Sequence, residues 1–181
     1  DMTVGKPLGL LVSFMLPLLI GNIFQQLYNM VDSIIVGQYV GADALAAVGA
    51  TGSLNFLIFS LCGGMANGTG VVISQHFGAG KNDQVKNTII NAAYIMLFCA
   101  VLMGGIGVIF ARKILIFLNT PDNILDSSTL YMTIICFGIL GVSLYNAVSA
   151  ILRAVGDSKT PLYFLMVSSV VNIVLDLLFI R

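Results

Sequence analysis

The chain has 181 residues, of which 58% are hydrophobic and 9% charged, and its mean hydropathy is +1.01. Soluble domains are about 45–50% apolar and about 25% charged, so this composition excludes a water-soluble fold. Eight basic residues balance eight acidic ones, which leaves no basic surface for nucleic acid and favours no nucleic-acid partner. The function is therefore expected inside a lipid bilayer.

Five stretches are long and apolar enough to be membrane-spanning helices, which need about 20 residues each. In chain order they are residues 8–36, 54–77, 89–110, 130–152 and 162–180. The segments between them are short and contain Gly, Pro, Asn and Asp, which favour turns. Helices joined by such short turns must pack antiparallel, so the sequence predicts an all-α, polytopic transmembrane helix bundle.

Positive charges in short loops predict the orientation, because they favour the cytoplasmic side of the membrane. With the N-terminus in the cytoplasm, the basic residues divide five to three: Lys6, Lys81, Lys86, Arg153 and Lys159 inside, and Arg112, Lys113 and Arg181 outside. The prediction is a multi-pass protein of the cytoplasmic membrane with its N-terminus inside.

Two glycine pairs have the four-residue spacing that lets helix backbones approach closely in lipid. These are Gly37 with Gly41, and Gly64 with Gly68. Glycine is common in membrane helices, so the pairs predict ordinary helix contacts and identify no activity.

The first predicted span carries a polar stripe. At about 100° per residue, its members fall within an arc of roughly 80°. They are Asn22, Gln25, Asn29 and Asp32, with Tyr28 at one edge of the arc. An Asp at the centre of a membrane helix costs about 2.5–3.5 kcal/mol on insertion scales, so the stripe is expected to face the bundle interior as a binding or proton site.

The fifth predicted span repeats the pattern, because Ser168, Asn172 and Asp176 follow one another at four-residue intervals on one face. Asp32 and Asp176 both fall in the outer half of the predicted bundle, so they can be neighbours. Two carboxylates in a poorly solvated site cannot both ionise cheaply without a cation or a shared proton. This is the physical requirement of a coupling-ion site.

A structural alternative is that the two aspartates and Asn172 only hydrogen-bond helices together, at around 0.6 kcal/mol per contact. That energy suffices for neutral residues such as Asn55 and Asn146. It does not suffice for a pair of carboxylates, for which a functional role is favoured.

Pro17 lies inside the first predicted span, where it removes a backbone hydrogen bond and bends the helix. One interpretation is a static kink that lets a long helix fit the membrane. The other is a hinge near the polar stripe. The sequence leaves both open.

Segments spread over almost the whole chain resemble the multidrug and toxic compound extrusion (MATE) transporters. They are LPL (16–18), NIFQQLY (22–28), VDS (31–33), GADALAAVG (41–49), SQHFGAG (74–80) and LRAVGDSKTP (152–161). The resemblance implies a secondary efflux pump with twelve helices in two six-helix lobes, driven by inward movement of Na⁺ or H⁺. Residues 1–181 would then be an incomplete N-terminal lobe that lacks the sixth helix and the second lobe.

The resemblance also implies roles for single residues. In the DinF-like branch of the family, a first-helix Asp and an Asn-xxx-Asp pair on the fifth helix form the cation site, and Asp32, Asn172 and Asp176 match these positions. Gln25 and Tyr28 match polar positions of the cavity that is thought to exchange protons and contact the drug. Asn22 and Asn29 share their stripe, so the same cavity network is expected to include them.

The implied partners are a small-molecule drug or toxin, the lipid bilayer and the missing second lobe. No cofactor is expected beyond the coupling ion. Carboxylate and amide oxygens suit a hard cation, so Na⁺ is possible at Asp32, Asn172 and Asp176. A shared proton suits the two carboxylates equally well.

The main alternative is a lipid-linked oligosaccharide or peptidoglycan-precursor flippase of the same superfamily. Such proteins usually need cationic residues in the cavity for a pyrophosphate headgroup, and no Lys or Arg lies deep within a predicted span. A channel needs repeated filter or ring residues. A hydrolase needs a nucleophile with a base or a metal site, and the chain has no HExxH or GxSxG motif. We therefore expect an antiporter that exports cationic or amphipathic compounds, and not an enzyme.

Overall fold

The structure is a computed structural model that describes residues 7–179, apart from the side chain of Leu177. Lys6, Ile180 and Arg181, which the predictions above include, lie outside these residues. The elements in chain order are α1 (Pro7–Ile35), the π-helical segment η1 (Val36–Val40), α2 (Ala42–Gly78), α3 (Asn82–Phe117), α4 (Asp122–Ala154) and α5 (Lys159–Phe179). The prediction of an all-α chain with five helices is confirmed for the described part.

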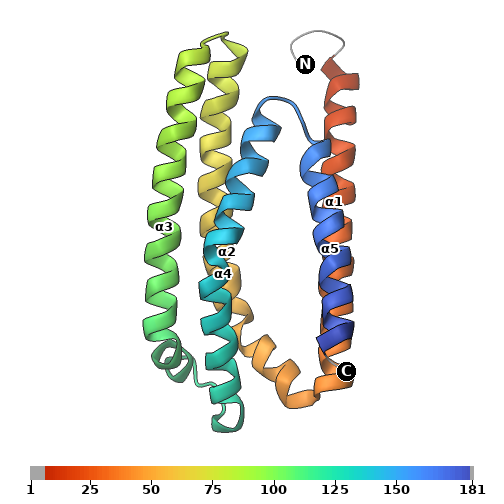
Figure 1. The fold of residues 1–181 in the computed structure, drawn as a ribbon, viewed down its shortest axis with the longest axis vertical. Coiled ribbons are helices and arrows are strands. Elements are labelled where there is room, and N and C mark those ends of the chain that lie inside the picture. Colours follow the sequence, from red (N-terminus) through yellow and green to blue (C-terminus); the bar gives the residue numbers. More distant parts are fainter. Residues whose placement is uncertain (1–6, 180–181) are drawn as a thin grey trace.

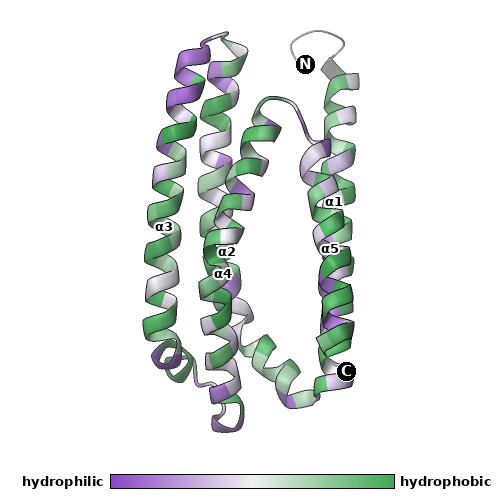
Figure 2. Ribbon diagram, viewed as in Figure 1, coloured by the Kyte–Doolittle hydropathy of each residue, from purple (hydrophilic) through white to green (hydrophobic). Residues whose placement is uncertain are grey.

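Within the described residues, four helices are long and apolar enough to cross a membrane: α1 continued through η1 (Leu8–Val40), α2, α3 and α4. Helix α5, the fifth predicted span, is not among these four. Each of the four extends beyond its predicted span. Asp43 and Asp83, for example, lie in the first turns of α2 and α3, where a negative charge is stabilised by the helix dipole. Figure 2 shows hydrophilic residues gathered at the ends of α3 and at the end of α4 near the α3–α4 turn, with apolar residues between.

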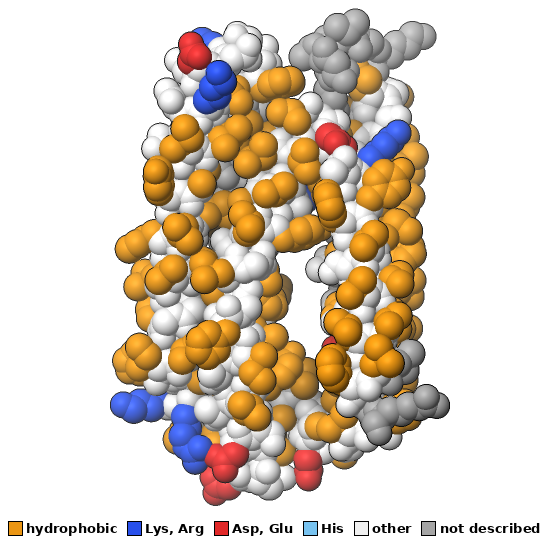
Figure 3. Space-filling model, in the orientation of Figure 1, with side chains coloured by type: hydrophobic (Ala, Val, Ile, Leu, Met, Phe, Trp, Pro, Cys, Tyr) orange, Lys and Arg blue, Asp and Glu red, His pale blue; other side chains and the backbone are white. Residues whose placement is uncertain are grey.

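The helices form two units. Helices α2, α3 and α4 pack against one another as a bundle, whereas α5 packs along α1 and makes few contacts with α4 (Figure 1). The space-filling view shows an opening between α4 and the α1–α5 pair (Figure 3). Covalently, the two units are joined by η1 and by the turn at residues 155–158.

The core of the bundle lies where its three helices meet. Ile58 and Cys62 of α2, Ala100 of α3, and Met132 and Cys136 of α4 are buried together. These side chains are apolar and mostly small, so the helices approach closely and gain dispersion contacts that lipid cannot supply.

Glycine brings α3 and α4 together, although at positions other than the predicted ones. A Cβ atom added to Gly107 would lie 2.2 Å from Cys136 Sγ, and one added to Gly104 would lie 2.9 Å from Ile139 Cγ2. Of the predicted pairs, only Gly37 faces a neighbouring helix, because a Cβ added there would lie 3.2 Å from Leu45 Cδ2 of α2. At Gly41, Gly64 and Gly68 an added Cβ would meet nothing within 4 Å. The spacing rule identified a pattern but could not tell which glycine faces a partner.

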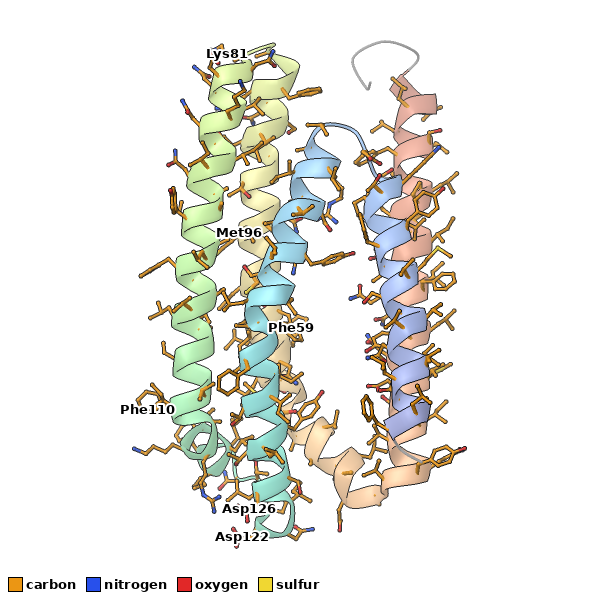
Figure 4. The ribbon with its side chains drawn as sticks, viewed as in Figure 1. Phe59, Lys81, Met96, Phe110, Asp122 and Asp126 are labelled. Atoms are coloured by element: carbon orange, nitrogen blue, oxygen red, sulfur yellow. The ribbon has the colours of Figure 1, made fainter. Side chains whose placement is uncertain are left out.

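Several exposed charged residues lie at the two ends of the molecule. Figure 4 shows Lys81 at the end where α2 and α3 meet, and Asp122 and Asp126 at the opposite end. Asp126 forms an ion pair with Arg112 of α3. Because both partners are more than half exposed, this pair contributes little stability and marks the border of the apolar region.

The turn between α4 and α5 has a defined structure. Gly156 has a φ of 93°, which a residue with a Cβ rarely adopts. The carboxylate of Asp157 then accepts hydrogen bonds from Thr160 Oγ1 at 2.6 Å and from the backbone N–H groups of Thr160 and Lys159, each at 3.0 Å. These bonds, above all the one from the Thr160 hydroxyl, lower the pKa of Asp157. Asp157 therefore caps α5 and fixes where it begins.

Candidate functional site

Two carboxyl groups meet between α1 and α5. Asp32 lies near the end of α1, Asp176 lies near the end of α5, and both side chains are partly buried. Because successive helices are antiparallel, α1 and α5 run in the same direction along the bundle. Their packing brings the two carboxyl groups close enough to interact directly. The predicted neighbourhood of these two residues is therefore present in the structure.

Asn172 lies one turn before Asp176 on the same helix. Asn172 Oδ1 and Asp176 Oδ2 are buried and have no hydrogen-bond partner among the described residues. Such an atom costs roughly 1–3 kcal/mol, and more when it is charged. The only other buried side-chain oxygen of this kind in residues 7–179 is Asn55 Oδ1 on α2. Two acceptor atoms without a donor are what a bound cation or a proton would satisfy.

Two tyrosines border the carboxyl groups. Tyr28 lies one turn before Asp32 and is within electrostatic reach of both aspartates, and Tyr131 of α4 is within reach of Asp32 and Tyr28. Tyr28 was predicted from the sequence, whereas Tyr131 was missed. The available signal was its hydroxyl, which a tyrosine in an apolar helix needs to place beside a polar partner.

The ligand set limits which ion can bind. Within residues 7–179 no group of three or more His, Cys, Asp or Glu residues could hold a metal ion. A bound cation would depend on two carboxylates and neutral oxygens, such as those of Asn172 and the tyrosines. Hard monovalent cations or protons fit this set better than transition metals do, since the latter prefer imidazole or thiolate ligands.

The remaining stripe residues do not join this cluster. Asn22 and Gln25 instead line a cavity of about 140 Å³, together with Pro17 on the same helix. Asn29 is exposed and its Nδ2 donates to Gln26 Oε1 at 3.4 Å. The predicted network is therefore divided between two places along α1.

This cavity lies between α1, α4 and α5. Helix α4 contributes Tyr145, Asn146 and Arg153 to its lining, and α5 contributes Leu162 and Leu165. Arg153 was predicted only as a charge in a cytoplasmic loop. It is instead part of the last turn of α4 and lines the cavity.

A family model described as MatE matches residues 17–178, which is most of the chain. The chain belongs to the MatE family. This model covers α1 from Pro17 onward and all of α2, α3 and α4, so it includes every residue of the two clusters above.

Known MatE relatives agree with this assignment. The probable multidrug resistance protein YoeA of Bacillus subtilis strain 168 is 36% identical over 90% of this chain, which corresponds to 35% of YoeA. YpnP of the same strain, also described as a probable multidrug resistance protein, is 35% identical over 99% of the chain and 40% of YpnP. A solved structure of a MOP superfamily transporter from Pyrococcus furiosus matches with a TM-score of 0.93 and 26% identity, over 99% of this chain and 40% of that one.

These comparisons confirm a multi-pass membrane transporter family without enzymatic activity. The chain spans about 35–40% of the length of the relatives it matches. The whole transporter's substrates and coupling ion therefore concern a larger protein than the residues described above.

Proposed function

We propose that this chain is the larger part of the N-terminal lobe of a cation-coupled antiporter of the DinF-like branch, which exports cationic or amphipathic compounds from the cytoplasm. Its missing parts would be a sixth helix and a second lobe. The observation that supports the proposal best is the meeting of Asp32 and Asp176 beside buried oxygens that have no partner. Substrates exchange places with Na⁺ or H⁺ in this proposal.

The chemistry of the carboxylates supplies a reason for exchange. Two neighbouring carboxylates in a poorly hydrated place repel each other, and a cation or proton between them removes that repulsion. A cationic substrate nearby would be stabilised by the same negative charge. Binding of the coupling ion therefore weakens the attraction for the substrate, which is the differential binding that antiport requires.

The flippase alternative fits the same helices less well. A pyrophosphate headgroup requires several cations around it. Near Asp32 and Asp176 the described groups are acidic, hydroxyl and amide groups, and Arg153 lines the other cavity at the end of α4. A negative headgroup beside the two aspartates would be repelled.

Efflux from vesicles tests the proposal. The complete transporter is reconstituted and loaded with ethidium, a lipophilic cation, and Na⁺ and pH gradients are imposed separately. We expect one inward gradient to drive ethidium export and its collapse to stop it. Export that ignores both gradients would contradict the proposed coupling.

The proposed orientation places the N-terminus in the cytoplasm. Cysteines introduced at Lys81 and Lys159 should then react with an impermeant maleimide only from the cytoplasmic side, and one at Lys113 only from outside. The reverse labelling pattern would overturn the orientation and leave the antiport proposal to the efflux assay.

A further inference from the structure

An apolar groove of about 350 Å³ runs along the surface of the bundle between α3 and α4. Buried Gly104 and Cys136 form its floor together with Gly105, and the side chains of Ile109 and Phe137, which are 72% and 71% exposed, form part of its walls. All the residues that line it belong to α3 or α4, so it lies on the face of these two helices away from α2. Helices α1 and α5 lie on the other side of α4 (Figure 1). The groove is therefore open to the lipid.

The groove has the depth of one leaflet of the bilayer. On α3 it extends from Ala100 to Ile109, whereas the predicted span of this helix covers residues 89–110. The groove thus begins near the middle of the membrane and ends near its edge. Nine residues of α-helix rise about 14 Å, and half of the hydrocarbon core is about 15 Å thick. One acyl chain of a phospholipid fits a groove of this length and position.

Charged side chains continue the line of the groove beyond its outer end. Arg112 lies seven residues, about two turns, after Gly105 on α3. Asp122 lies fourteen residues, about four turns, before Cys136 on α4, and Asp126 follows one turn later. Figure 4 shows both aspartates at this end of α4. These three side chains are therefore on nearly the same helix faces as the groove.

The charged groups at this end keep free bonding capacity. Arg112 Nη1 donates to Asp126 Oδ1, and the two side chains are 57% and 83% exposed. The pair uses one of five N–H donors of the guanidinium and one of two carboxylate oxygens. Asp122 is exposed and forms no ion pair within residues 7–179. Lys113 Nζ lies over the ring of Phe110, at 5.8 Å from its centroid, and neither residue lines the groove.

The order of these groups matches the order of groups in phosphatidylethanolamine. The apolar groove comes first, the guanidinium next, and the carboxylate of Asp122, in the first turn of α4, lies furthest from the membrane centre. A guanidinium suits a phosphate, and a primary ammonium can donate three hydrogen bonds to carboxylates. The quaternary ammonium of phosphatidylcholine has no N–H donor. Phosphatidylglycerol has no cation, and two carboxylates beside one guanidinium repel its negative charge.

We propose that the groove between α3 and α4 binds phosphatidylethanolamine. One acyl chain lies along Gly105, the phosphate meets Arg112, and the ammonium meets Asp126 and Asp122. The site lies on the bundle, apart from the residues of the α1–α5 pair, and does not depend on the proposed antiport. With the N-terminus in the cytoplasm, the lipid belongs to the outer leaflet.

Competition between headgroups tests the proposal. The complete transporter is purified in detergent and mixed with equal amounts of phosphatidylethanolamine, phosphatidylcholine and phosphatidylglycerol that have identical acyl chains. Native mass spectrometry counts how much of each lipid stays bound. We expect the wild type to retain about fivefold more phosphatidylethanolamine than either of the other lipids, which is the size expected for one accessible charged contact. Equal retention of the three lipids would overturn the proposal, even if no variant folds.

Variants of the charged residues identify the headgroup contacts. Asp122→Asn combined with Asp126→Asn should lower retention of phosphatidylethanolamine to the level of phosphatidylcholine and raise that of phosphatidylglycerol, because the carboxylates no longer repel it. Arg112→Gln should lower retention of all three lipids, since each has a phosphate. The matched control is Asp83→Asn, which neutralises an exposed aspartate at the other end of α3 and should leave the preference intact. A preference that survives in the double variant, or that is lost in Asp83→Asn, would contradict the proposed contacts.

A variant of the groove tests the acyl-chain contact separately. Gly105→Leu places a side chain in the groove, where an added Cβ meets no other atom within 4 Å, and should lower retention of phosphatidylethanolamine. Gly64→Leu on α2 is the matched control, because an added Cβ there is equally free and Gly64 does not line the groove. Retention that is unchanged in Gly105→Leu would overturn the groove as the site. A dimer that Gly105→Leu dissociates would show that a second copy occupies the groove and would also overturn the proposal.

Discussion

The α2–α3–α4 bundle and the α1–α5 pair are both mainly apolar, but they differ in how they pack and in which polar groups they contain. In the most apolar 18-residue stretch of α2 and of α4, 28% of the residues are buried. In the corresponding stretch of α1 no residue is buried. The bundle buries small apolar side chains and brings α3 and α4 together at glycines. The pair instead holds both aspartates and two of the buried oxygens without partners.

This difference teaches that the close-packed scaffold and the proposed ion site lie in separate parts of the fold. The bundle gains its stability from close packing, and substitutions there should change stability. The pair is attached to the bundle through η1, through one turn and through few close approaches of α5 to α4, and substitutions there should change transport. The predictions below test that division, from the largest expected effect to the smallest.

The largest effect is expected for Asp32→Asn, which removes the charge and keeps nearly the same shape. Ion-driven ethidium efflux should fall by about 100-fold or more, on the order of 3 kcal/mol in the activation free energy, because the proposed site then lacks one of the two carboxylates that would share the coupling ion. The matched control is Asp83→Asn, which neutralises an exposed aspartate at a helix end. Efflux that persists in Asp32→Asn, or that is equally lost in Asp83→Asn, would break the division.

A substitution in the bundle should act on stability instead. Gly104→Ala places a Cβ against Ile139 and against the carbonyl oxygen of Cys136, at 2.9 and 3.0 Å, and should cost about 1–3 kcal/mol. Gly105→Ala is the matched control, because an added Cβ there meets nothing within 4 Å. SDS titration of the purified transporter measures both. Equal stability of the two variants would show that α3 and α4 are not tightly packed.

The turn that joins the two units should show a smaller and pH-dependent effect. Asp157→Ala removes the cap of α5 and should cost about 1 kcal/mol at neutral pH. Because hydrogen bonds lower the pKa of folded Asp157 below its ordinary value of 3.8, the stabilisation is present above that value. It is lost as the pH falls through the lowered folded pKa.

SDS titration of wild type and Asp157→Ala at neutral and at acidic pH measures how much stability the Asp157 cap contributes. Thr160→Val removes the hydroxyl donor and should lose only part of the stabilisation. A difference between wild type and Asp157→Ala that grows toward acid would contradict the assigned role of the carboxylate.

The smallest effect is expected for Pro17→Ala in α1, where the residue lines the cavity beside Gln25. If bending at Pro17 links ion binding to substrate movement, efflux should fall about threefold, which is below 1 kcal/mol, with ion affinity unchanged. Unchanged efflux would show that Pro17 is a static kink. Within the α1–α5 pair, the transport function would then rest on the polar residues alone.

The helices themselves could be predicted from the sequence, because apolar runs of sufficient length have no other stable form in a membrane. The packing of Asp32 with Asp176 was also predictable from helical phase and depth. Phase alone could not divide the α1 stripe, since Asn22 and Asp32 share a face yet lie about 15 Å apart along the axis. The two ends of one stripe consequently line different places.

Contributions from other helices were harder to predict. Tyr131 is one aromatic residue in an apolar run and gains its meaning only when α4 is placed beside α1. Arg153 resembles a loop charge until α4 is seen to extend far enough to include it and to place it in the lining of the cavity. Gly104 and Gly107 show no distinctive spacing against the many glycines of the chain, and only the three-dimensional contact with Cys136 identifies them.

A double-mutant cycle on ion affinity tests the central claim most directly, which is that Asp32 and Asp176 share one cation or proton. Asp32→Asn, Asp176→Asn and the double variant of the complete transporter are titrated with Na⁺ by calorimetry and with protons by a pH indicator. One shared site predicts that each single variant loses most of the binding and that the double variant loses little more. Losses that add, as for two independent sites, would contradict the account.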